Sequence, residues 1–136
     1  QAAGLHAMLA MIARFCDEQA GNPAVAEFLG PLREKAAEWQ ALTLLIGQRA
    51  VGDAEEIGAA AWDYLFYSGY VVLAYWWARS VAAAETPGHA QAFKDAKRET
   101  ARFYFARILP RTLAHAAAIA SGASPLMTLP AGQFDA

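Results

Sequence analysis

Hydrophobic side chains recur at helical spacing in four stretches of this chain. Residues 5–19 and 31–50 carry an apolar residue at every third or fourth position, which is the period of an amphipathic helix. Residues 54–84 and 89–121 continue the pattern on either side of a turn sequence at 85–88. Because short connections place consecutive helices antiparallel, the pattern predicts an all-α fold, an antiparallel four-helix up-down bundle in a single domain.

The ends of the predicted helices carry local signals. A short helical piece at 24–29 should be interrupted by Gly30-Pro31, since proline disfavours helix at the residue before it. Asp53 is expected to cap the third helix, with Glu56 completing a capping box. Gly122 is expected to end the last helix, because glycine readily adopts the backbone conformation found there.

The last predicted helix contains a proline, Pro110, well inside its pattern. Proline removes the hydrogen bond to the carbonyl of Ala106 and crowds that turn, so we expect a kinked helix, bent near these residues, rather than a stop. The tail at 123–136 shows no helical pattern, and it is too apolar for an ordinary disordered end. We therefore expect Leu126 and Phe134 in this tail to dock on another surface.

The third helix is apolar on more than one face. No charged residue occurs between Tyr64 and Ala78, a run of 15 residues that is shorter than the roughly 20 needed to cross a bilayer. A helix that is apolar all round must either be buried or span a membrane. Because the run is too short to span, we expect no membrane span and instead a central helix with neighbours on at least two sides. Its two apolar stripes are Ile57, Ala61, Leu65, Ser68, Val72 and Tyr75, and Trp62, Phe66, Gly69, Leu73, Trp76 and Trp77.

A four-helix bundle buries only one wide face of each helix, so part of this apolar surface should remain outside. The register that we expect places Leu65, together with Trp39 on the second helix, in the core. It leaves Tyr67, Tyr70 and Trp77 on the outer face as candidate interaction residues.

Composition strengthens the expectation of a partner. Hydrophobic residues make up 57% of the chain and charged residues only 18%, against usual shares of about 45–50% and a quarter. The net charge of −2 gives no electrostatic basis for binding nucleic acid. The single cysteine, Cys16, excludes an internal disulfide and suits the reducing cytoplasm. With no signal peptide and no initiator Met at Gln1, we expect a fragment of a longer chain.

The sequence lacks the motifs of common catalytic and metal sites. A di-iron bundle requires Glu-x-x-His on two helices, and this motif does not occur in the chain. His6, His89 and His115 lie on separate segments. Cys16 falls on an apolar stripe and is expected in the core. We therefore predict no catalytic, cofactor-binding or metal-binding set of residues in this chain.

Two charged features leave alternatives open. A basic cluster on the last helix could hold a phosphate, although the simpler interpretation is a solvated face with Asp95 and Glu99 interleaved. Asp63 lies between two aromatic residues and could act as an acid or base, although pairing with an arginine from a neighbouring helix is the simpler interpretation. The basic cluster consists of Lys94, Lys97, Arg98 and Arg102.

The chain from about Leu32 to Phe134 resembles a known family, most specifically in its last third. The stretch Phe103-Tyr104-Phe105-Ala106-Arg107-Ile108-Leu109-Pro110-Arg111 leads into an alanine-rich run and a Ser-Gly-Ala end. This pattern, with the tail that follows, is similar to the end of long-form bacterial acyl-CoA dehydrogenases, including relatives of 3-methylmercaptopropionyl-CoA dehydrogenase. The helix from Tyr64 to Arg79 is similar to the helix that precedes it in that family.

The resemblance implies an accessory C-terminal domain of an FAD-dependent acyl-CoA dehydrogenase. The flavin and the catalytic carboxylate belong to the family's core domains, so FAD is expected in the parent enzyme and no cofactor in this chain. The expected partner is that catalytic core or a second subunit, with a homodimer as the simplest assembly. Its contact surface would include Tyr67, Tyr70 and Trp77 with Leu126 and Phe134.

Two other functions remain possible from the sequence. A free-standing bundle could bind a small hydrophobic or CoA-type ligand, in which case Trp62, Tyr67 and Trp76 should line an enclosed pocket. An interfacial membrane module could use the aromatic helix and the tail.

Overall fold

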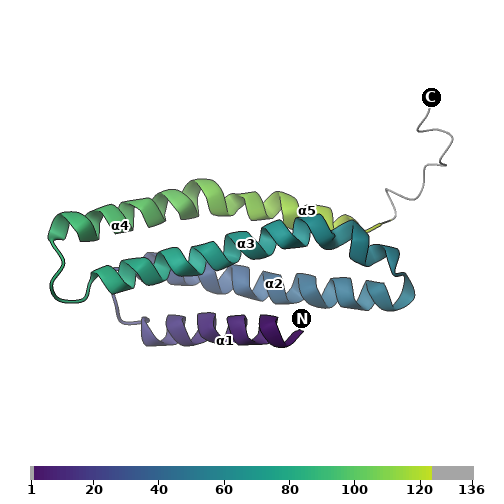
Figure 1. The fold of residues 1–136 in the computed structure, drawn as a ribbon, viewed down its shortest axis with the longest axis horizontal. Coiled ribbons are helices and arrows are strands. Elements are labelled where there is room, and N and C mark those ends of the chain that lie inside the picture. The colour runs from purple at the N-terminus through teal and green to yellow at the C-terminus, as the bar shows by residue number, and fades with distance from the viewer. Residues whose placement is uncertain (1, 124–136) are drawn as a thin grey trace, which may run out of the picture.

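The computed structural model describes residues 2–123, and the regular structure in that range is helical. Figure 1 shows antiparallel rods, in which α4 and α5 follow one another along the last rod. The predicted all-α bundle with up-down topology is confirmed. Its elements are α1 (Ala2–Glu18), α2 (Ala26–Gly52), α3 (Glu55–Ala84), α4 (Gln91–Phe103), a π-helix (Tyr104–Ile108), a 3-10 helix (Leu109–Arg111) and α5 (Thr112–Ser121).

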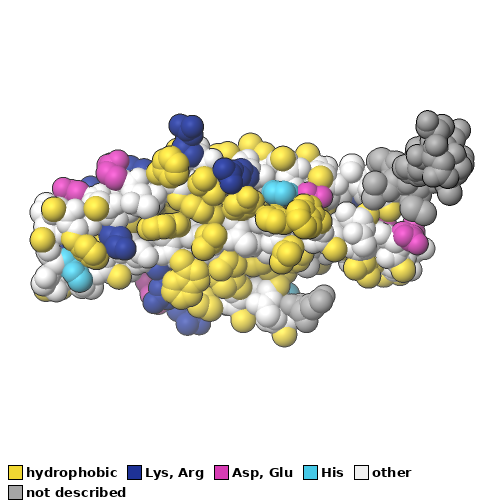
Figure 2. Space-filling model, turned by 45° about the horizontal axis from the view of Figure 1, so that its top comes forward, with side chains coloured by type: hydrophobic (Ala, Val, Ile, Leu, Met, Phe, Trp, Pro, Cys, Tyr) yellow, Lys and Arg dark blue, Asp and Glu magenta, His cyan; other side chains and the backbone are white. Residues whose placement is uncertain are grey.

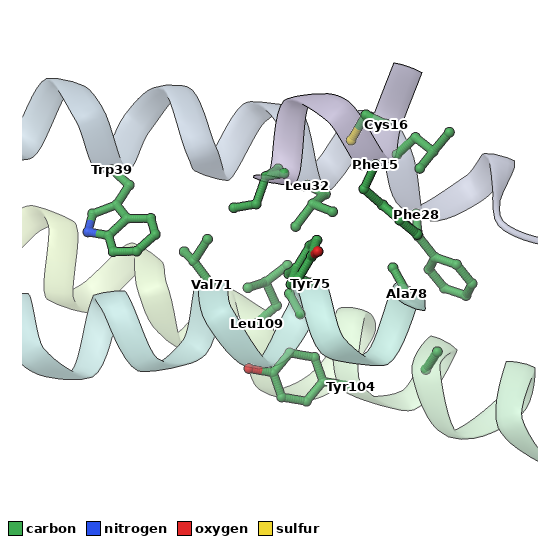
Figure 3. Packing of buried hydrophobic residues seen from close by; sticks show 14 of the residues in the cluster. Phe15, Cys16, Phe28, Leu32, Trp39, Val71, Tyr75, Ala78, Tyr104 and Leu109 are labelled. Carbon is green, nitrogen blue, oxygen red and sulfur yellow. The ribbon is translucent and has the colours of Figure 1, made fainter. Parts of the chain in front are cut away.

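The helix α3 is the centre of the bundle. It packs against α2 on one side and against α4 and α5 on the other, while α1 lies mainly on α2. Phe15 of α1 also reaches α3, where its ring meets the edge of Tyr75 at a centroid distance of 5.6 Å. Figure 3 shows side chains from these helices converging on one core, among them Leu32, Val71 and Leu109.

The helix α2 begins earlier than the sequence predicts. It runs from Ala26 through Gly30-Pro31 without a break, so the prediction of a separate piece at 24–29 is wrong. Proline costs this helix one hydrogen bond near its start, because Pro31 has no N–H. Phe28 and Leu32 on either side are only 2% and 0% exposed, and their burial on the same helical face holds the helix together across the proline.

The start of α3 shows half of the predicted capping box. The side-chain Oδ1 of Asp53 accepts a hydrogen bond from the N–H of Glu55 at 2.9 Å, which satisfies one of the free donors of the first turn. The carboxylate of Glu56 does not return to Asp53. It accepts the N–H of Ala123 at 3.1 Å, so it ties the start of α3 to the end of the last rod.

The end of α5 follows the prediction for Gly122. This glycine has φ of +74°, and its N–H donates to the carbonyl of Ile119 at 3.2 Å. Arg49 of α2 donates to the carbonyls of Ile119 and Ala120 at 3.2 and 2.9 Å. A cation at a helix C-terminus also complements the helix dipole, so α2 stabilises the end of α5.

The predicted disturbance near Pro110 takes the form of a π-helix followed by a 3-10 helix. The N–H of Leu109 donates to the carbonyl of Tyr104, five residues back, which is the π pattern. The hydroxyl of Thr112 donates to the carbonyl of Leu109 at 2.6 Å, and α5 continues from there. The expectation that the helical path resumes after the proline is confirmed. The tail residues Leu126 and Phe134 lie outside the described residues.

Candidate interaction surface

The inward side of α3 is built from small residues and tyrosines rather than from its largest apolar residues. Trp39 of α2 is 6% exposed, as predicted for a core residue. Leu65 of α3 is 66% exposed, so its assignment to the core is wrong. Small side chains allow the neighbouring helices to approach α3 closely. Its buried residues are Ala60, Tyr67, Val71, Ala74, Tyr75, Ala78, Val81 and Ala84.

Tyr67 illustrates why the register of α3 differs from the expected one. The side chain is fully buried, and its hydroxyl donates to Oε1 of Glu38 at 2.6 Å and lies 3.2 Å from the carbonyl of Lys35. Burial, with the Glu38 carboxylate beside it, raises the pKa of Tyr67 far above its usual range. The expectation that Tyr67 stays on the outer face is therefore wrong. Tyr70 and Trp77 are half-buried against the core, and their role as interaction residues stays a prediction.

The opposite side of α3 carries a row of large apolar residues that remain exposed. We call this row the α3 outer face. Figure 2 shows hydrophobic side chains gathered along the middle of the bundle, with few charged side chains among them. The α3 outer face consists of Trp62, Leu65, Phe66, Leu73 and Trp76, which are 67, 66, 37, 49 and 49% exposed.

One edge of the α3 outer face is closed by a histidine from α5. Nδ1 of His115 lies 2.8 Å from Oδ1 of Asp63, and the imidazole stacks on the rings of Phe66 and Tyr70 at 5.5 and 5.8 Å. Asp63 thus pairs with a histidine and not with the expected arginine. Among the described residues no hydroxyl or thiol bonds to His115, so the pair lacks the nucleophile of a catalytic triad.

The far end of the α3 outer face is flanked by Arg79. Its Nη1 donates to the hydroxyl of Tyr75 at 2.9 Å, and its guanidinium lies 5.8 and 5.5 Å from the ring centroids of Tyr75 and Trp76. These distances are typical of cation–π contact. Arg79 therefore lies over one side of the Trp76 ring, and Trp76 remains 49% exposed.

Two of the four residues of the basic cluster on α4, Arg98 and Arg102, are paired with carboxylates. Arg102 donates to both carboxylate oxygens of Glu27 at 2.8 Å and to Glu99 at 2.6 Å. Arg98 lies 3.6 Å from the carboxylate of Glu85. The hydrogen bond from Arg102 lowers the pKa of Glu27. These pairs support the simpler interpretation of a solvated, charged helix face over a phosphate site.

The clefts of the bundle do not form the pocket expected for a ligand-binding bundle. A cleft of about 320 Å³ lies between α1 and α3, beside Arg14, Glu18 and Arg79. Tyr67 points into the core while Trp62 and Trp76 lie outside, so these three aromatics do not share a pocket. Within residues 2–123 no cluster of His, Cys, Asp and Glu could hold a metal ion.

The family of this chain follows from comparing its sequence with known protein families. Residues 8–130 match the family described as acetyl-CoA dehydrogenase C-terminal like. The chain belongs to this family. The match covers most of α1 and all of the later helices, so it confirms the family resemblance predicted for about Leu32 to Phe134 and extends it into α1.

As an acetyl-CoA dehydrogenase C-terminal-like domain, the bundle has the all-helical form predicted from its sequence. The narrower resemblance to 3-methylmercaptopropionyl-CoA dehydrogenase stays a prediction. A comparison with curated proteins finds no significant match. None of the helices in the described range is long and apolar enough to cross a membrane.

Proposed function

We propose that this chain is the accessory C-terminal domain of an FAD-dependent acyl-CoA dehydrogenase. It supplies a protein-binding surface, which packs on the enzyme's catalytic core or on a second subunit, and no catalytic groups. The observation that carries the proposal is the α3 outer face. A cytoplasmic location goes with it, because a single unpaired cysteine, Cys16, suits a reducing compartment.

The size and position of the α3 outer face support a protein partner. At roughly 150–250 Å² per large side chain, the exposed fractions of 37–67% leave about 500 Å² of apolar surface in one row. The largest apolar patch of a typical monomer has about that size and is often functional, so the patch is consistent with a protein-binding surface. Trp62 and Trp76 stand at the two ends of the row, and tryptophan is among the residues that contribute most to binding energy.

Two features of the described residues support placing the flavin outside this chain. Flavin dinucleotide sites commonly use a glycine-rich turn at a helix N-terminus to bind the pyrophosphate, and α3 instead starts with Glu55 and Glu56. The cleft beside Arg14 and Glu18 is open and carries both signs of charge. We therefore assign the flavin and the oxidation of the acyl-CoA to the catalytic core of the enzyme.

The absence of a catalytic set is tested with the purified chain. A visible spectrum should show no stoichiometric flavin band after incubation with FAD. Assays of acyl-CoA oxidation with an artificial electron acceptor should show no turnover above background. A stoichiometric flavin band or clear turnover would overturn the accessory role.

A further inference from the structure

Four of the five residues of the α3 outer face follow a symmetric pattern about Gly69. Trp62 and Trp76 lie seven residues before and after this glycine, and Leu65 and Leu73 lie four residues before and after it. Four residues correspond to about one helical turn and seven to about two, so the two leucines and the two tryptophans lie along the same side of α3 as Gly69. All four are 49% or more exposed.

We infer that the α3 outer face binds the same face of a second copy of this chain, with the two α3 helices antiparallel and Gly69 at the twofold axis. In such an isologous contact each residue at a given distance before the axis meets the residue at the same distance after it. Trp62 of one copy would then lie against Trp76 of the other, and Leu65 against Leu73. The inference rests on the interaction surface of the proposed function and names its partner.

Symmetry favours a second copy over the catalytic core as the occupant. A different protein would impose its own pattern on the helix, with no reason for equal residues at equal distances from one glycine. A twofold contact requires each side chain to be compatible with its counterpart, and Trp with Trp and Leu with Leu meet that requirement. The uncharged run from Tyr64 to Ala78 also places no like charges opposite one another across the centre.

Gly69 itself supplies an independent observation. Glycine within a helix is destabilising by about 0.5–1 kcal/mol relative to alanine. A Cβ at Gly69 would meet no atom within 4 Å, so the packing of the bundle does not require a glycine there. The absence of a side chain in the middle of a row of large ones leaves a notch, which allows a second helix to cross closely at that point.

The area of the α3 outer face is sufficient for a specific dimer. About 500 Å² from each copy makes about 1,000 Å² in total, which is the lower limit for a biological interface. The side chains at its edges, with Tyr70 and Trp77 beside them, would add to that area. The contact would be small and centred on the two Trp62–Trp76 pairs.

Disulfide trapping tests the position of the axis. A disulfide requires Cα atoms about 4.4–6.8 Å apart, so Gly69→Cys should give a covalent dimer under mild oxidation. Gly58→Cys is the matched control, because it is also an exposed glycine of α3 with no atom within 4 Å of an added Cβ. In an antiparallel dimer two copies of position 58 are 22 residues apart along the helix, about 33 Å. The wild-type chain controls for the buried Cys16.

A mixing experiment tests the orientation. A chain with Leu65→Cys and a chain with Leu73→Cys should cross-link to each other when mixed, and neither should cross-link efficiently alone. Circular dichroism of each variant before oxidation shows whether the bundle is folded. Trapping of Gly58→Cys as efficiently as Gly69→Cys would indicate parallel or random contact and would overturn the inference.

The outcomes separate this inference from the proposed function. A folded Gly69→Cys chain that forms no cross-link above the Gly58→Cys control would overturn the twofold contact. If that chain still bound a dehydrogenase catalytic core, the accessory role would stand with a different occupant on α3. A flavin band or acyl-CoA turnover in the isolated chain would overturn the accessory role whatever the cross-links show.

Discussion

Substituting Gly122 tests the junction at the end of α5, where the last rod is fastened to α2 and α3. Gly122 has φ of +74° and ψ of −167°, a region of backbone conformation that is essentially restricted to glycine. A Cβ there would lie 3.1 Å from Nη1 of Arg49 and 3.1 Å from Oε2 of Glu56. Gly122→Ala would therefore strain the backbone and press on both side chains that hold this end.

The expected loss of stability follows from these two effects. Holding a residue with a side chain in this backbone region costs about 1–3 kcal/mol. The contacts with Arg49 and Glu56 add less, because both groups are the ends of flexible side chains and can move. If Arg49 moves, however, its hydrogen bonds to the carbonyls of Ile119 and Ala120 weaken. We expect Gly122→Ala to lower the free energy of unfolding by about 1–3 kcal/mol.

Gly58→Ala provides the control, since it makes the same chemical change inside α3. Gly58 is exposed, has no atom within 4 Å of an added Cβ, and should gain about 0.5–1 kcal/mol from the better helix former. Urea unfolding followed by circular dichroism would compare the two variants with the wild type. The two substitutions should shift the midpoint in opposite directions. A Gly122→Ala midpoint at or above that of the wild type would refute our description of the end of α5.

Three further predictions concern the core, the cysteine and the charged face. Trp39→Ala should lower the free energy of unfolding by about 3–5 kcal/mol. Substitution of the exposed Leu65 by alanine should lower it by about 0.5 kcal/mol or less. Equal shifts in the urea midpoint of the monomer would contradict the register of α3. Burial raises the pKa of the Cys16 thiol, so a thiol reagent should modify it only at the rate of unfolding, and rapid labelling of the native chain would argue against its burial. The hydrogen bond from Arg102 lowers the pKa of Glu27 below its ordinary value of about 4.5. The pair therefore contributes its full stability above about pH 4.5, and this contribution is lost as the pH falls through the lowered pKa of Glu27. In the Glu27→Gln variant the urea midpoint should therefore fall less on acidification than it does in the wild type, when both are measured across a pH series.

The helices were predictable from the sequence because each has its own periodic pattern. The exceptions depend on how the helices pack together. The start of α2 crosses Gly30-Pro31 because burial of Phe28 and Leu32 outweighs one lost hydrogen bond. The π-helix near Pro110 depends on how the rod packs over α3, which the spacing of apolar residues along the chain does not reveal.

The register of α3 could not be read from the sequence because the helix is apolar on all sides. Hydrophobicity alone favours burying Leu65, but close helix packing favours alanine, and a hydrogen-bond partner on α2 makes Tyr67 suitable for the core. That partner, Glu38, lies 29 residues away in sequence. The pairing of Asp63 with His115 joins residues 52 positions apart, and likewise depends on the tertiary fold.

We propose that the α3 outer face contacts another protein chain, and that this partner is a second copy of the same chain. Sedimentation equilibrium across a concentration series would measure it most directly, on the wild type, on Leu73→Glu and on Leu113→Glu. Leu113 of α5 is also exposed, at 62%, but it lies two residues from His115, about 200° around the helix, and so away from the α3 outer face. We predict a dimeric wild type, a folded monomer for Leu73→Glu and a dimer for Leu113→Glu. A wild type that stays monomeric at the highest concentrations, or a Leu73→Glu variant that dimerises as the wild type does, would overturn the contact between two copies of α3.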